Sequence, residues 1–118
     1  MENVFEITML LDFYGQLLTQ RQLEIMDLHY NDDLSLAEIA EQLEISRQGV
    51  FDNIKRGKAA LIQFEDKLGL VKKFLEQKHK AENLLKELEQ IDKNELSQNN
   101  KKCLESIRQG LKEIAEEV

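Results

Sequence analysis

Hydrophobic residues recur every three or four positions through the first 68 residues, which is the spacing of one face of an α-helix. This pattern divides that part of the chain into four helices, at about residues 4–18, 20–30, 36–43 and 47–68. The positions expected to face a shared core are Ile7, Leu10, Leu11, Tyr14, Leu17, Leu18, Leu23, Met26, Tyr30, Leu36, Ile39, Ala40, Leu43, Val50, Ile54, Gly57, Leu61 and Phe64. We therefore predict an all-α fold.

Capping residues mark where these helices begin. Three pairs have the spacing of a capping box, in which a later side chain reaches back to the cap: Asn3 with Glu6, Thr19 with Gln22, and Ser35 with Glu38. Ser46 is a further cap without such a partner, and Gly69 provides a stop for the fourth helix. We expect residues 1–68 to form one domain.

Beyond Gly69 the apolar positions follow a heptad spacing. A first stripe consists of Leu70, Phe74, Gln77, Ala81, Leu84, Leu88 and Ile91, and a second consists of Leu104, Ile107, Leu111, Ile114 and Val118. A polar stretch at residues 92–95 separates them, and Ser97 is placed to cap the second helix. Residues 69–118 are therefore predicted to form an arm of two antiparallel helices.

Two apolar residues of the fourth helix, Ala59 and Ile62, lie on the side that water would reach in an isolated domain. Such residues are expected to be covered. Either the arm packs back on this helix, or a second copy of the chain supplies the cover as a homodimer through the C-terminal helices.

The segment at residues 34–58 is the most informative part of the sequence. It predicts a short helix, a three-residue turn and a second helix that starts after Ser46, which is the layout of a helix-turn-helix. The small side chain of Ala40 permits close crossing of the helices, and Leu43 and Ile45 are placed to fill the corner. Helical corners without a DNA-binding role share this pattern, so the spacing alone leaves both uses open.

A resemblance to known families adds to this interpretation. Region 4 of bacterial sigma factors is similar to residues 18–61, which read LTQRQLEIMDLHYNDDLSLAEIAEQLEISRQGVFDNIKRGKAAL. The small YlxM family of Gram-positive bacteria resembles the chain more closely, through the opening MLLDFYGQLLT, the core LHYNDDLSLAEIAEQL and the helix ISRQGVFDNIKR. The resemblance implies a sigma region 4-like helix-turn-helix fold, with a regulatory role or a helper role in the signal recognition particle pathway.

Individual positions support the sigma-like pattern unevenly. Those that agree with it are Ala40, Ile45, Ser46, Val50, Ile54 and Arg56. The turn position that usually holds glycine is Glu44, which would have to adopt a left-handed or nearly left-handed backbone. Phe51 and Asn53 stand where sigma factors often carry basic or small polar residues, so the resemblance does not imply sigma-type promoter reading.

The fourth predicted helix presents a candidate DNA-reading face. At about 100° per residue, Gln48, Asp52 and Lys55 lie opposite the apolar side. Gln48 suits a paired contact with adenine and Lys55 suits guanine or phosphate. Asp52 suits cytosine, although its charge also repels phosphate. The side chains expected to contact the phosphate backbone are Arg47, Arg56 and Lys58.

Charge limits how nucleic acid binds. The 118-residue chain has 23 acidic and 16 basic side chains, a net charge of −7, which opposes a general attraction to phosphates. Residues 46–64 nevertheless carry four bases and one acid, a local +3, while residues 31–45 carry five acids and no base. We therefore expect a few phosphate contacts on one patch and an affinity that falls readily with salt.

Composition narrows the class of protein further. The absence of proline and the presence of only five glycines favour long helices. The longest apolar run, at residues 59–62, is too short to span a membrane, and Glu2 and Glu6 do not fit a signal peptide. We therefore predict a cytoplasmic protein without membrane insertion. The single cysteine, Cys103, excludes an internal disulfide, and we expect it to be a small packing residue.

No group of residues has the spacing of a catalytic or metal site. His29 and His79 lack a second His or Cys at ligand spacing. Asp32 and Asp33 precede the Ser35 cap, where turn formation is the simpler use for them. The sequence also lacks a glycine-rich phosphate loop. We therefore predict that the protein is not an enzyme and uses no metal or cofactor.

Two functions stay open. The first is a helix-turn-helix regulator whose recognition helix binds duplex DNA. The second is an adaptor that contacts protein or RNA of the signal recognition particle machinery without binding DNA. The bases of residues 46–64 favour the first, and the net charge favours the second. The DNA-binding regulator is our leading hypothesis, with the signal recognition particle pathway as the setting that the resemblance implies.

Overall fold

The computed structural model describes residues 3–117, which form helices and turns and contain no β-strand. The α-helices are α1 (Val4–Tyr14), α2 (Gln20–Met26), α3 (Leu36–Leu43), α4 (Arg47–Leu68), α5 (Leu70–Glu89) and α6 (Gln98–Glu116). The prediction of an all-α fold is confirmed. The helices belong to two compact units, with the boundary between Val71 and Lys72. Val118, which we expected at the end of the second heptad stripe, lies outside the described residues.

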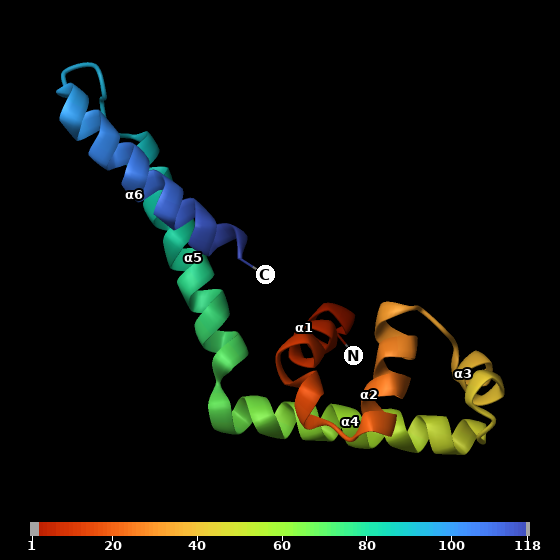
Figure 1. Ribbon diagram of the computed structural model, residues 1–118. Coiled ribbons are helices and arrows are strands. Elements are labelled where there is room, and N and C mark those ends of the chain that lie inside the picture. Colours follow the sequence, from red (N-terminus) through yellow and green to blue (C-terminus); the bar gives the residue numbers. More distant parts are fainter. Residues whose placement is uncertain (1–2, 118) are drawn as a thin grey trace. The chain divides into compact units, whose positions relative to one another are not determined.

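In the first unit α1, α2 and α3 all pack against the long α4 (Figure 1). The most completely buried side chains, each at most 1% exposed, are Tyr14, Ile25, Met26, Ile39, Val50 and Leu61. The predicted core is confirmed at most positions, and Ile25 and Val71 join it in addition. The prediction for Leu17 is wrong, because this side chain is 57% exposed.

The predicted caps are present. A side-chain oxygen of each cap accepts a hydrogen bond from the backbone N–H three residues later at Asn3, Thr19, Ser35, Ser46 and Ser97. Thr19 and Ser35 form complete capping boxes with Gln22 and Glu38. Gly69 ends α4 in a left-handed conformation, with φ of 62°. Local sequence therefore explains where most helices start and where α4 stops.

Two helices end earlier than their hydrophobic patterns predict. α1 stops at Tyr14 and is followed by a 3₁₀ turn, η1 (Gly15–Leu17). This tighter turn directs Leu17 away from the core, which accounts for its exposure. α2 stops at Met26 and is followed by a π-helical segment, η2 (Asp27–Asn31), whose wider turn keeps Tyr30 buried.

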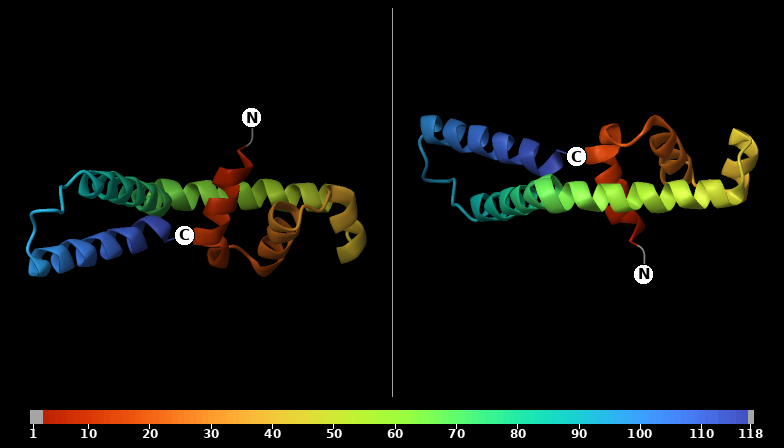
Figure 2. Two further views of the ribbon diagram at one scale, coloured as in Figure 1. Left: turned by 90° about the horizontal axis from the view of Figure 1, so that it is seen from above. Right: turned by 90° about the horizontal axis from the view of Figure 1, so that it is seen from below.

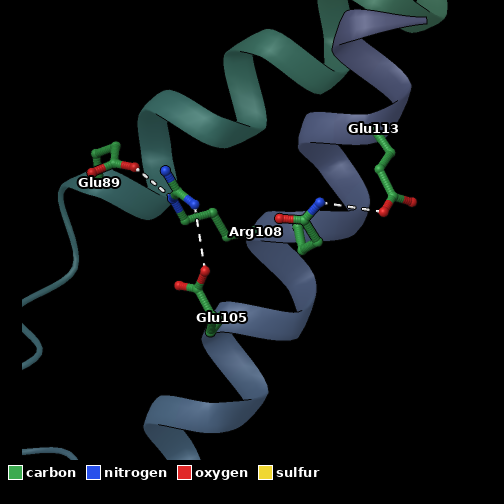
Figure 3. Close-up of polar contacts among 5 residues, drawn as sticks. Glu89, Glu105, Arg108 and Glu113 are labelled. Atoms are coloured by element: carbon green, nitrogen blue, oxygen red, sulfur yellow. Dashed lines mark hydrogen bonds and ion pairs between the residues drawn. The ribbon is translucent and has the colours of Figure 1, made fainter.

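In the second unit α5 and α6 lie side by side and antiparallel, forming a helical hairpin (Figure 2). Arg108 of α6 pairs with Glu89 near the end of α5, and also with Glu105 of its own helix, at 3.4 Å in both cases (Figure 3). Ala81 is the one buried apolar residue among the described residues from 72 onward. Each helix of the hairpin therefore has a partner on one side only.

The two predicted heptad stripes are partly covered. On α5, Ala81 is buried and Phe74 and Leu88 are half-buried. The α5 stripe residues that remain exposed are Leu70, Gln77, Leu84 and Ile91. On α6, Leu104 and Leu111 are half-buried, whereas Ile107 and Ile114 are exposed. Each stripe is therefore buried in part, because two helices cover only part of each other's apolar face.

Candidate nucleic-acid interface

The corner between α3 and α4 has the geometry of a helix-turn-helix turn. Glu44 adopts a left-handed backbone, with φ of 58° and ψ of 42°, as its place in the turn predicts. The N–H of Ile45 donates to the Ala40 carbonyl oxygen at 3.1 Å, and the N–H of Glu44 donates to that of Glu41 at 3.4 Å. These paired bonds form a Schellman motif, which stops α3 and reverses the chain within a few residues.

Apolar packing holds this corner. Ala40 and Val50 are buried, and Leu43 and Ile45 are half-buried against the same core. Ser46 then starts α4, since its hydroxyl oxygen accepts a hydrogen bond from the Gly49 N–H at 2.9 Å. The first turns of α4 are therefore fixed on the inside and leave their outer side to solvent.

The outer side of α4 carries the residues that we singled out from the sequence. Arg47, Gln48, Lys55 and Arg56 are exposed, and Asp52 and Lys58 are half-buried. The opposite side consists of Val50, Ile54, Gly57, Leu61 and Phe64, of which all but the half-buried Phe64 are buried. The division of the helix into a core side and a solvent side is as predicted. The role of the solvent side stays a prediction.

One pair of these side chains is already joined. The Gln48 side-chain amide donates to the Asp52 carboxylate at 3.0 Å, one helical turn away. In this arrangement Asp52 orients the Gln48 side chain and engages its donor. A paired contact of Gln48 with adenine, which needs that N–H, would require the Asp52 bond to open. Spacing predicts the proximity of the two residues but not the bond.

Phe51 is an exposed residue that our DNA-reading face did not include. Its side chain is 49% exposed and lies one turn from both Arg47 and Lys55. The sequence signal that could have placed Phe51 on this face is its position, four residues after Arg47 and four residues before Lys55. A large apolar ring between two basic side chains is suited to contact with the methyl group of thymine.

The charges around the corner are of both signs. Glu41 and Glu44 are exposed at the end of α3, and Glu44 stands three residues before Arg47 of α4. Glu38 is also exposed, and the backbone N–H of Ser35, followed by the Ser35 hydroxyl, lowers the pKa of its carboxyl. An approaching phosphate therefore meets acidic side chains within a short distance of the basic ones.

The structure also shows the surroundings of His29, Asp33 and Cys103. His29 Nδ1 lies 2.9 Å from the Leu34 carbonyl oxygen, and its ring packs edge-on against Tyr30 at 4.8 Å between centroids. Asp33 occupies the turn before α3, with φ of 58°. The expectation that Cys103 is a packing residue is wrong, because this side chain is exposed.

Residues 3–117 contain neither a metal-binding cluster nor a membrane-spanning helix. No three of their His, Cys, Asp and Glu side chains are grouped in a way that would hold a metal ion. None of the helices in this part of the chain has the length and apolar character needed to cross a membrane. Ala59 and Ile62 of α4 both stay exposed, Ile62 at 48%.

Comparison with known proteins places the chain in a family. A family model described as "Putative helix-turn-helix protein, YlxM / p13 like" matches residues 1–107. A UPF0122 protein of Acetivibrio thermocellus is 55% identical over 116 residues, which cover 98% of this chain and 99% of the relative. The UPF0122 protein YlxM of Bacillus subtilis is 52% identical over 95 residues, which cover 80% of this chain and 86% of the relative.

A UPF0122 protein of Thermoanaerobacter pseudethanolicus is 44% identical over 108 residues, which cover 92% of each chain. The family description names a helix-turn-helix protein and not an enzyme. The observed corner between α3 and α4 agrees with that description. The chain therefore belongs to the UPF0122 family of YlxM/p13-like helix-turn-helix proteins.

Proposed function

We propose that this protein is a DNA-binding regulator that acts in the cytoplasm and contacts duplex DNA with the outer side of α4. The observation that carries the proposal is the corner between α3 and α4, which leaves the first turns of α4 exposed. Arg47, Gln48, Lys55 and Arg56 all lie there with their side chains in solvent. In a helix-turn-helix the second helix enters the major groove with these first turns foremost.

The side chains divide into two kinds of contact. Gln48, Lys55 and Phe51 are suited to base edges, with the Phe51 ring against a thymine methyl group. Asp52 acts mainly by orienting Gln48 through their 3.0 Å hydrogen bond, and accepts from cytosine when that bond opens. The side chains assigned to phosphates are Arg47, Arg56 and Lys58. Phosphate contacts determine affinity and base contacts determine sequence preference.

The alternative function is an adaptor that binds protein or RNA of the signal recognition particle machinery. Two observations favour it: the net charge of −7, and the exposed acidic residues Glu41 and Glu44, which come shortly before the basic residues of α4 in the chain. Under the leading proposal the protein binds DNA, and the signal recognition particle pathway is the cellular pathway in which it takes part. A second copy of the chain is the further partner that we propose, through the C-terminal helices.

Fluorescence anisotropy with duplex DNA at low salt tests the proposal. Neutralising Arg47, Lys55 and Arg56 to alanine should abolish most binding. Each lost phosphate contact should also lower the slope of log affinity against log salt by about 0.9. By contrast, Gln48→Ala should leave that slope unchanged and weaken binding at a preferred site by about 1–3 kcal/mol.

The matched control neutralises Lys86, Lys93 and Lys102, three exposed bases of the hairpin, and produces the same net charge. This control should bind DNA as the unmodified chain does. Equal losses of DNA affinity in both triple variants would mean that net charge alone causes the loss, which would contradict the proposed surface. Absence of duplex binding by the unmodified chain, with recovery of signal recognition particle RNA or protein on the tagged chain from lysate, would favour the adaptor.

A further inference from the structure

The hairpin of α5 and α6 has an apolar side that its own two helices leave uncovered. Leu84 and Ile91 of α5 are 38% and 43% exposed, and Ile107 and Ile114 of α6 are 52% and 45% exposed. These residues line two adjoining grooves of about 460 and 420 Å³, which share Leu84 and Leu111. We call the two together the hairpin groove.

α6 shows most clearly how little apolar surface the hairpin buries. This helix has 19 residues and an apolar stripe, yet none of its described residues is buried. Most helix stability in proteins comes from packing of an apolar face, and α6 leaves Ile107 and Ile114 of its own face exposed. The exposed ion pair of Arg108 with Glu89 adds little, because water and salt screen such surface pairs. The hairpin therefore needs a further partner to bury its apolar side.

Gly110 provides a second, independent observation. It lies in the middle of α6, between Ile107 and Ile114 on the same stripe, and is exposed. A Cβ atom added there would meet nothing within 4 Å, so packing within the hairpin does not explain a glycine. Glycine in the middle of a helix makes that helix less stable than alanine would. A small residue at this point does allow the helix of another molecule to approach closely.

The charges beside the groove identify the kind of partner. Lys80 and Glu87 stand about one turn to either side of Leu84, and both line the groove. A second hairpin turned antiparallel about an axis near Leu84 would bring Lys80 of each copy towards Glu87 of the other. The same rotation would bring Ile107 of each copy towards Ile114 of the other, with Gly110 near the axis. The surface is therefore complementary to itself, as a two-fold interface requires.

The distribution of charge along the chain agrees with this partner. Residues 65–118 carry 12 acidic and 11 basic side chains, a net charge of −1, so the remaining −6 belongs to residues 1–64. Two hairpins can thus approach each other with little like-charge repulsion, whereas two first units repel. We propose that the hairpin groove binds the same groove of a second copy, so that the four helices form an antiparallel bundle. This inference rests on the self-association proposed above and is independent of DNA binding.

Sedimentation of the full chain tests the interface. The unmodified chain should sediment at twice 13.8 kDa, and the double variant Ile107→Lys with Ile114→Lys should sediment at 13.8 kDa. Both side chains are exposed in the single chain, so circular dichroism should show that the variant retains its helices at low temperature. The control is Leu75→Lys, an exposed apolar position on the opposite side of α5, which should leave the dimer intact.

A charge exchange tests the orientation of the two copies. Lys80→Glu alone should weaken the dimer by placing like charges together, and Glu87→Lys alone should do the same. The two changes combined should restore it, which a merely structural role of either residue would not produce. A chain that is monomeric up to about 0.1 mM, a dimer that survives the double Ile variant, or failure of the combined exchange would each overturn the inference. DNA binding is measured separately by anisotropy, so either proposal can fail without the other.

Discussion

The first unit and the hairpin are both built from amphipathic helices with well-formed caps, yet they bury their apolar residues very differently. α4 is covered along one side by α1, α2 and α3, and Val50 and Leu61 are fully buried beneath them. In the hairpin, α6 has no buried residue among those described. A helix that packs on three others buries its apolar side in a core, whereas a helix that packs on one leaves much of its apolar side exposed.

Removing core volume is the strongest way to test this comparison. Leu61→Ala should destabilise the first unit by about 2–5 kcal/mol, because it leaves a cavity among fully buried neighbours. Its neighbour in sequence, Ile62→Ala, should change stability by less than about 0.5 kcal/mol, since that side chain is 48% exposed. Urea unfolding followed by circular dichroism measures both. Similar losses would mean that the exposed side of α4 is covered in solution.

The junction of α4 with α5 is held by a polar contact that belongs to the first unit. The Tyr14 hydroxyl donates to Glu65 Oε1 at 2.5 Å and accepts a hydrogen bond from the Leu70 N–H at 3.1 Å. Glu65 Oε1 also accepts from the Val71 N–H at 3.1 Å. Tyr14→Phe should therefore cost about 1–3 kcal/mol, because it removes a partner from the carboxylate and from the N–H.

This contact also predicts a dependence on pH. Burial, and next the hydrogen bond to Glu65, raise the pKa of Tyr14 above its ordinary value of 10.0. The stabilisation is therefore fully present below pH 10 and is lost as the pH rises through the raised pKa of Tyr14. Unfolding of the unmodified chain and of Tyr14→Phe should differ most at neutral pH and converge in alkali. A constant difference would contradict this assignment.

Equivalent caps in the two regions give the smallest of the expected effects. Ser35→Ala should destabilise the first unit by about 0.5–2 kcal/mol, because α3 loses the cap of its first turn. Ser97→Ala removes the matching cap of α6 and should instead increase hydrogen exchange within the hairpin alone. Protection of the Ile25 and Val50 amides reports the first unit in both variants. Loss of their protection in Ser97→Ala would mean that the two regions unfold as one.

The Ser35 capping box also titrates. Because the pKa of Glu38 is lowered by Ser35, this contribution is present above the ordinary value of 4.5 and is lost as the pH falls through the lowered pKa. Alanine keeps the Ser35 backbone N–H, which is the larger cause, and loses only the hydroxyl, so the destabilisation by Ser35→Ala should be slightly larger at neutral pH than in acid. Equal destabilisation at both pH values would assign the whole effect to the hydrogen bond that the Ser35 hydroxyl oxygen accepts from the Glu38 N–H.

The sequence by itself determined the features that depend on neighbouring residues. Caps three positions from their partners and Gly69 at a helix end follow from local hydrogen bonding and sterics, whereas the left-handed backbone of Glu44 followed from its place in the sigma-like turn pattern. The sequence also predicted which side of α4 is buried, because a long helix with one apolar side has only one way to face a core. The split of α4 into a buried side and a basic side was predictable for the same reason.

Tertiary structure alone decided the features that depend on which elements meet. The 3₁₀ turn after Tyr14 and the π-helical η2 adjust the register of α1 and α2 to the core, and no local pattern encodes that adjustment. The heptad spacing of α5 and α6 did not indicate which positions would be covered. Leu84 and Ile107 remain exposed because a stripe specifies that a helix packs, while the number and position of its partners specify how much of the stripe is buried.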